Sequence, residues 1–98
     1  MQAIRKSITT PEMYFQITQP HTDKKGKKYK AATAFARVGN DGEWCTTLVR
    51  CSEEDNFCRK TGRTMAKRHW FNPEKFPVSL ETSTPPSYDE VVAFYKSI

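Results

Sequence analysis

The sequence lacks the features that mark several common classes of protein. Its 98 residues contain no apolar run long enough to cross a bilayer, and the opening letters MQAIRKSITT lack the apolar stretch of a signal peptide. There is no glycine-rich phosphate loop, and the only two histidines are His21 and His69. We therefore expect a cytoplasmic, non-enzymatic protein that uses no cofactor and has no membrane partner.

Cysteine is also scarce. Cys45, Cys51 and Cys58 are odd in number and lack C-x-x-C spacing, which favours reduced thiols. A zinc site that joins Cys58 to His69 is not expected, because one helix would hold these two ligands roughly 16 Å apart along its axis. The sequence thus predicts neither a disulfide framework nor a metal site.

Positive charge is what the sequence does have. Sixteen Lys and Arg against eleven Asp and Glu give a net charge of +5, which favours an acidic partner such as nucleic acid. A hydrophobic content of 37% supports one modest core. We expect a single domain over residues 1–98, with a flexible N-terminus at 1–10 and a proline-bearing linker at 72–86.

Three segments predict an antiparallel sheet. EMYFQIT at 12–18 and KYKAATAFARV at 28–38 are rich in β-forming residues. The turn letters GNDG at 39–42 then lead into EWCTTLVRC at 43–51. The economical arrangement is a three-stranded meander whose first connection is a long basic loop.

Alternation along the second and third segments predicts two unlike sheet faces. We expect a small, smooth face formed by Ala32, Ala34, Ala36 and Val38 together with Cys45, Thr47, Val49 and Cys51. We expect an aromatic face that joins Tyr29, Phe35 and Arg37 to Trp44, Leu48 and Arg50. The aromatic face has two interpretations: it stacks on a ligand, or the segment after residue 70 folds across it as a second core layer.

The letters SEEDNFCRKTGRTMAKRH predict an amphipathic helix from about Ser52 to His69. Ser52 is the expected N-cap, and residues 53–55 place acids in the first turn, where the helix dipole favours them. An interior glycine costs about 1 kcal/mol relative to alanine. We therefore expect Gly62 to pack closely against the small sheet face.

A second helix is predicted at the C-terminal end of the sequence. Ser87 and Glu90 form a capping box for SYDEVVAFYKSI. Its apolar side would carry Tyr88, Val91, Val92, Tyr95 and Ile98. The expected fold class is therefore α+β: a three-stranded antiparallel sheet packed by one basic amphipathic helix, plus a short C-terminal helix.

The candidate binding residues are mostly cations. The first helix carries Arg59, Lys60, Arg63 and Lys67 on one side without an interleaved acid, and the hairpin loop adds Lys24, Lys25, Lys27 and Lys28. Arg37, Trp44 and Arg50 extend the set on the aromatic face. These residues either contact the phosphates of a nucleic acid or form solvated surfaces.

The segment EEDNFCRKTGRTMAKRHW resembles a motif of small uncharacterised accessory proteins of tailed bacteriophages, D-x-F-x-[RK]-[KR]-x-G-R-x-x-A. The matching residues are Asp55, Phe57, Arg59, Lys60, Gly62, Arg63 and Ala66. Arg68, His69 and Trp70 depart from the short apolar run that follows in that family. The resemblance implies a phage accessory protein in the host cytoplasm and implies no particular activity.

Two functions remain open at this point. The first is non-catalytic nucleic-acid binding, through the cationic helix side and the lysine-rich loop. The second is inhibition or modulation of a host defence or transcription protein, in which the same cations meet an acidic protein surface.

Overall fold

The protein is an antiparallel sheet with one helix on each face. The structure is a computed structural model, and it describes residues 11–56 and 59–98. Its elements are β1 (Glu12–Ile17), β2 (His21–Thr22), β3 (Lys28–Val38), β4 (Trp44–Ser52), α1 (Arg59–Trp70), β5 (Leu80–Thr82) and α2 (Tyr88–Ser97). The predicted α+β class is confirmed, whereas the expected N-terminal flexibility and the residues Phe57 and Cys58 lie outside the described residues.

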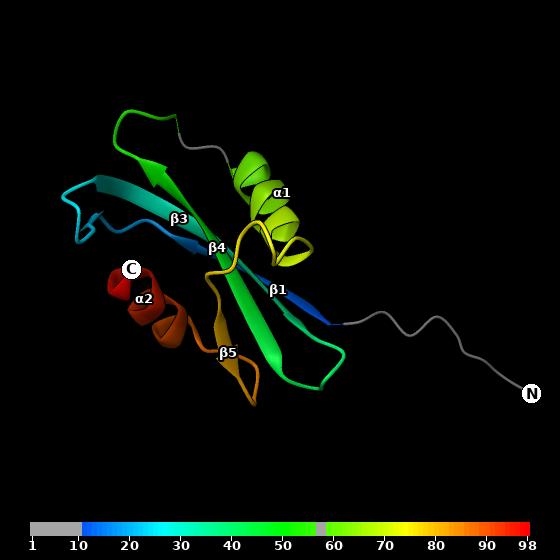
Figure 1. The fold of residues 1–98 in the computed structure, drawn as a ribbon. Helices are drawn as coiled ribbons and strands as arrows, with labels where there is room; N and C mark the ends of the chain where they lie inside the picture. The colour runs from blue at the N-terminus through cyan, green and yellow to red at the C-terminus, as the bar shows by residue number, and fades with distance from the viewer. Residues whose placement is uncertain (1–10, 57–58) are drawn as a thin grey trace, which may run out of the picture.

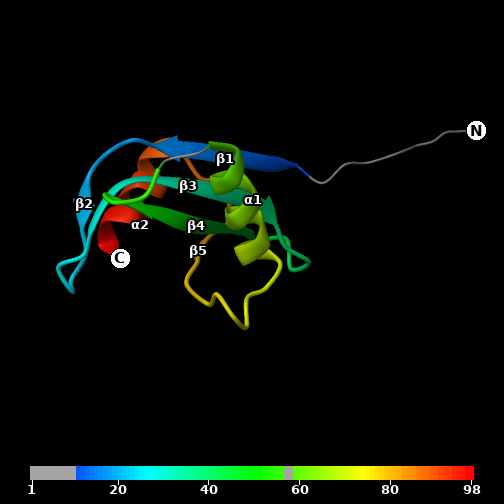
Figure 2. The ribbon, with the colours of Figure 1, turned by 90° about the horizontal axis from the view of Figure 1, so that it is seen from above.

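The sheet has five strands rather than three. Its order is β1-β3-β4-β5, with β2 also paired to β3, and every pairing is antiparallel. Figure 2 shows β1, β3, β4 and β5 following one another in that order. The two additional strands, β2 and β5, are two and three residues long, too short to give a periodic sequence signal. They lie in the predicted basic loop and in the predicted proline-bearing linker.

The predicted composition of the two sheet faces is wrong. The observed register pairs Phe35 with Thr47 and Ala34 with Leu48. Gly39 N–H donates to the Glu43 carbonyl over 2.8 Å, so three residues, not four, form the loop between the ladder pairs. When a hairpin loop is one residue shorter, every side chain of the following strand lies on the other face of the sheet.

The corrected faces differ in character. One carries Thr33, Phe35, Thr47 and Val49 and is covered by α1, while the other carries Ala32, Ala34, Leu48 and Arg50 and is covered by α2. Figure 1 shows the two helices on opposite sides of β4. Phe35 and Trp44 therefore belong to different faces and cannot form one aromatic layer.

Helix α1 touches the sheet through its small residues. A Cβ atom added to Gly62 would lie 3.0 Å from Thr33 Cβ and closer still to the Thr33 hydroxyl. The Thr47 hydroxyl donates to the Ala66 carbonyl over 2.7 Å. Close packing of Gly62 is thus confirmed, but its partner is Thr33 on the face of Phe35 rather than the alanine face.

The main core lies between the sheet and α2. It joins Ile17, Tyr29, Ala32 and Ala34 to Val91 and Tyr95, all buried. Tyr29 reaches this side because the register shifts between Tyr29 and Ala31. The predicted capping box of Ser87 and Glu90 is present, whereas Tyr88, expected on the apolar side, is 42% exposed.

The predicted start of the first helix is wrong. Ser52 ends β4 opposite Tyr29, and its hydroxyl donates to Asp55 Oδ2 over 2.8 Å instead of capping a helix. A turn follows, closed by the Asp55 N–H on the Ser52 carbonyl. The long β3 strand offers β4 a pairing partner as far as Ser52, so ladder hydrogen bonds compete successfully with the cap.

Candidate nucleic-acid interface

Helix α1 carries an exposed group of cations, which we call the α1 ridge: Arg59, Lys60 and Arg63. All three side chains are exposed, and none forms an ion pair with a carboxylate of the described residues. Gly62 and Ala66 hold one side of α1 against the sheet. At about 100° per residue, Arg59 and Arg63 lie next to that side and Lys60 lies nearer the opposite one, so the ridge runs along an exposed flank of the helix.

The ridge begins at the helix end where cations are least favourable. Arg59 and Lys60 open α1, whose first turn contains no acid. The N-terminal end of a helix carries a partial positive charge, and each cation there costs about 0.3–1 kcal/mol. The helix dipole therefore gives no folding reason for these two cations at this position.

Beside the ridge lies an aromatic ring that the sequence did not single out. Tyr14 on β1 is 41% exposed, its ring centroid lies 5.1 Å from that of buried Phe35, and the Arg63 guanidinium lies 5.9 Å from the Tyr14 ring. β1 is an edge strand, so nothing on the described chain pairs with its outer side. The sequence signal was alternation in EMYFQIT, which places Tyr14 on the face that α1 covers.

Two other predicted cations are engaged by a single acid. Glu12 Oε2 accepts from Arg37 at 3.1 Å and lies 3.5 Å from Lys67 Nζ. The Arg37 guanidinium also lies 5.5 Å from the Trp70 ring and 5.2 Å from the Phe71 ring. Arg37 and Lys67 are thus neighbours of the α1 ridge whose charge is already partly balanced.

The lysine hairpin, formed by Lys24, Lys25, Lys27 and Lys28, is a separate surface. Asp23 organises it: its Oδ1 accepts from the backbone N–H groups of Lys25 and Lys27, each over 2.9 Å, and Gly26 supplies a positive φ of 87°. The Lys27 backbone hydrogen bond is the main cause of a lowered Asp23 pKa. Both views show this hairpin at the end of the sheet away from α1, so the structure does not join the two cationic sets.

Arg50 and Trp44, both predicted as binding residues, have structural roles. Arg50 Nη1 donates to the Ile98 carbonyl over 3.3 Å and lies 3.8 Å from Asp23, and its guanidinium lies 4.3 Å from the Tyr29 ring. These contacts fasten α2 to the sheet. Trp44 is only 8% exposed, so its ring cannot receive a ligand.

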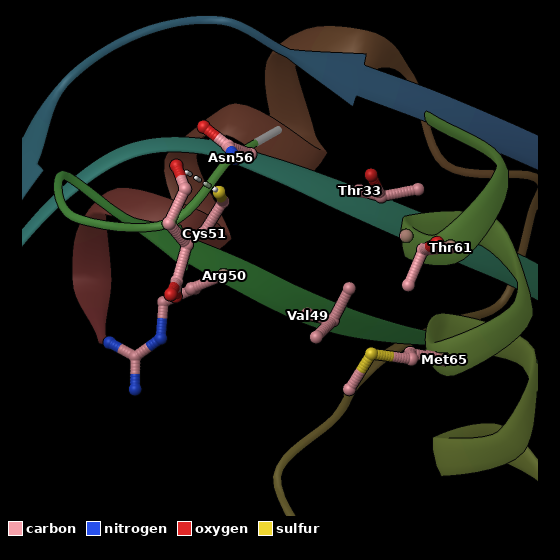
Figure 3. Close-up of a pocket in the computed structure, with 9 residues that line it drawn as sticks. Thr33, Val49, Arg50, Cys51, Asn56, Thr61 and Met65 are labelled. Carbon is pink, nitrogen blue, oxygen red and sulfur yellow. Dashed lines mark hydrogen bonds between the residues drawn. The ribbon is translucent and has the colours of Figure 1, made fainter. Parts of the chain in front are cut away.

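A hollow of about 340 Å³ lies between α1 and β4 (Figure 3). Val49 and Met65 face each other across it, Thr33 lies close to α1, and Cys51 lies beneath Asn56. Gly62 also lines the hollow. The Cys51 thiol donates to the Asp55 carbonyl at 3.8 Å. The lining is largely uncharged, so this hollow is not part of the cationic interface.

Two titratable side chains near the sheet have pKa values shifted by burial. Over residues 11–56 and 59–98, no three His, Cys, Asp or Glu side chains converge in a way that would hold a metal ion. Burial lowers the pKa of His69, whose ring stacks on Phe76 at 3.8 Å between centroids. Burial likewise raises the pKa of Cys45. Both groups are packed side chains rather than poised acids or nucleophiles.

Neither helix of the described chain combines the length and apolar character needed to span a membrane. Compared with protein-family models, curated proteins and solved structures, the chain matches none.

Proposed function

We propose that this protein binds nucleic acid without catalysis, through the α1 ridge. The observation that supports this most strongly is the placement of Arg59 and Lys60 in an acid-free first turn, exposed and without ion pairs. Phosphates would offset the unfavourable interaction of these cations with the helix dipole. Arg63 continues the same surface one turn further along the helix.

The exposed Tyr14 ring favours single-stranded nucleic acid over duplex. Phe35 supports the ring from inside and Arg63 flanks it, so the ring is held in place. Aromatic rings beside a cationic track bind unpaired bases by stacking, which contributes about 1–3 kcal/mol per base. We infer that phosphates lie on the α1 ridge and that one base stacks on Tyr14.

The test compares two variants that change the net charge equally. In the first, Arg59→Glu, Lys60→Glu and Arg63→Glu reverse the ridge; in the second, Lys24→Glu, Lys25→Glu and Lys27→Glu reverse the lysine hairpin. Binding of a labelled single strand of about 20 nucleotides is measured by fluorescence anisotropy at several salt concentrations. The ridge variant should lose binding, and the hairpin variant should keep most of it.

Tyr14→Ala separates stacking from charge. It should weaken binding of the single strand by about 1–3 kcal/mol and leave duplex binding nearly unchanged. If both charge-reversal variants lose binding equally, net charge and not the ridge is responsible. If instead the ridge variant loses a protein partner that wild type retains after nuclease treatment, the ligand is an acidic protein, such as a host target of a phage accessory protein.

A further inference from the structure

Strand β4 has a free edge over half its length. β4 runs from Trp44 to Ser52, but β5 pairs only with Trp44, Cys45 and Thr46. In the described part of the chain, no strand pairs with that edge beyond Thr46. An unpaired strand edge presents backbone donors and acceptors to any extended chain that can reach them.

The ladder pattern identifies which backbone groups face this edge. Gly39 and Glu43 form a hydrogen-bonded pair at the start of the β3–β4 ladder, and the register continues without a shift to Ala31. Hydrogen-bonded and non-hydrogen-bonded pairs alternate along an antiparallel ladder. Leu48 and Arg50 therefore direct their N–H and C=O groups away from β3. Arg50 lies in the unpaired stretch of this edge.

Hollows flank the edge on both faces of the sheet. On the α1 face lies the hollow of Figure 3, with Val49 and Met65 in its lining. On the α2 face lies a second hollow of about 310 Å³. Its apolar lining consists of Leu48, Phe76, Pro77, Val78, Phe94 and Ile98. Arg50 borders both hollows, as expected if its backbone forms the rim between them.

This arrangement fits the alternation of a β-strand. Successive side chains of a strand point to opposite faces of a sheet, so a strand laid along Leu48–Ser52 would put neighbouring side chains into the two hollows in turn. Met65 and Val78, one at each hollow, are 38% and 59% exposed. Large exposed apolar side chains on both sides of a free edge are what strand addition would bury.

The charges at the edge indicate what kind of strand fits. The second hollow is lined by Lys75 and His69 and by Arg50, whose guanidinium already lies 3.8 Å from Asp23, and by no Asp or Glu side chain. A second copy of this chain would bring its own Arg50 and Lys75 to the same short edge, where like charges oppose pairing. An acidic residue placed opposite Arg50 would instead face the same hollow as Lys75, which forms no ion pair among the described residues.

We propose that the Leu48–Ser52 edge of β4 binds an extended peptide by antiparallel strand addition, with an acidic side chain opposite Arg50 and apolar side chains in the two hollows. This site does not depend on nucleic-acid binding, because it lies on β4 and not on the α1 ridge. The partner is a protein segment with alternating acidic and apolar character.

A short capped peptide tests the proposal. The probe is acetyl-Thr-Thr-Glu-Val-Leu-Thr-amide, in which Glu is opposite Arg50, Val is opposite Val49 and Leu is opposite Leu48. Two matched controls each carry one backbone N-methyl group, on Glu or on Val. In antiparallel pairing the Glu N–H points to the Arg50 carbonyl and the Val N–H points away. Titration is followed by amide NMR shifts of the full chain at peptide concentrations up to about 1 mM.

The probe should shift the amides of Leu48–Ser52. N-methylation of Glu should weaken binding at least about tenfold, the effect of one lost hydrogen bond, whereas N-methylation of Val should have a much smaller effect. Val78→Asp should weaken binding by repelling the probe's acid, while Tyr88→Asp, at an exposed aromatic elsewhere, should not. In the free protein, the Arg50 amide should exchange with solvent faster than those of Val49 and Cys51.

Three results would overturn the proposal. One is the absence of shifts at the highest probe concentration. Another is equal weakening by the two N-methyl groups, because binding would not follow the hydrogen-bond pattern of a strand. The third is a solution dimer in which the Arg50 amide is protected, which would assign the edge to a second copy of this chain.

Discussion

Helix α2 places Asp89 and Glu90 in its first turn and Lys96 in its last, and it buries Val91 and Tyr95. Helix α1 opens with Arg59 and Lys60, has no acid in its first turn, and buries only Ala66 among its residues. The charges of α2 agree with the helix dipole and its apolar side supplies the core, so folding explains that helix. The cations at the start of α1 oppose the same dipole. Folding thus explains the charges of α2 but not the cations at the start of α1.

The largest expected effect concerns the aromatic side chain beneath α1. Phe35 is fully buried and contacts Tyr14 and Trp70. Phe35→Ala should lower the free energy of unfolding by about 3–5 kcal/mol, because it leaves a cavity between α1 and the sheet. Urea unfolding followed by circular dichroism measures the change. A loss below about 1 kcal/mol would show that α1 is only loosely attached to the sheet.

The next effect concerns the close contact of α1 with β3. Gly62→Ala should gain about 1 kcal/mol of helix propensity but lose more through collision with Thr33, for a net destabilisation of about 1–3 kcal/mol. In a Thr33→Ala background the cost should shrink, since the nearest atom is removed. A Gly62→Ala variant that melts at a higher temperature than wild type would place this residue away from the sheet.

Ser52 and Ser87 allow the starts of the two helices to be tested separately. Ser87→Ala should cost about 1 kcal/mol because it removes the cap of α2. Ser52→Ala should cost less than about 0.5 kcal/mol, since Ser52 bonds to exposed Asp55 and caps no helix. Thermal unfolding measures the stability lost at each position. Equal losses would indicate that Ser52 caps a helix, as the sequence predicted.

The pH dependence at the end of α1 should be smaller. Burial lowers the pKa of His69 in the folded state, so the unfolded chain binds a proton more readily. The stability contributed by neutral His69 is therefore full above the unfolded pKa of about 6.5 and declines as the pH falls below it. Unfolding of wild type and His69→Gln, compared between about pH 5.5 and 7.5, isolates this contribution. If the free energies of unfolding of the two proteins changed with pH in the same way, His69 would make no such contribution.

Local patterns predicted much of the fold. Alternation located β1, β3 and β4, turn letters located their connection, and the capping box located the start of α2. The faces were wrong because side-chain parity depends on a single turn residue, and the letters GNDG do not reveal that Gly39 and Glu43 pair with each other. The first helix start was wrong because Ser52 suits a cap locally, while its ladder partner Tyr29 is distant in the sequence.

The candidate site was predictable only in part. Helical periodicity identified Arg59, Lys60 and Arg63, since it needs only local spacing. The contributions of Tyr14 and Glu12 depend on the pairing of β1 with β3, which brings distant segments together. Tertiary contacts also join Arg50 of β4 to Ile98 at the end of α2 and bury Trp44. No local sequence pattern distinguishes these two residues from residues that are free to bind a ligand.

We propose that the first cations of α1 serve binding at a cost to folding, and one double variant tests both parts of this proposal. Gln has about the same helix propensity as Lys and Arg, so Arg59→Gln with Lys60→Gln removes charge with little other change. The free energy of unfolding of this variant should exceed that of wild type by about 0.3–1 kcal/mol for each replaced cation. The salt dependence of its single-strand binding should fall by about 0.7 for each phosphate that the protein no longer neutralises. Unchanged salt dependence of binding together with a lower free energy of unfolding would contradict a binding role for Arg59 and Lys60.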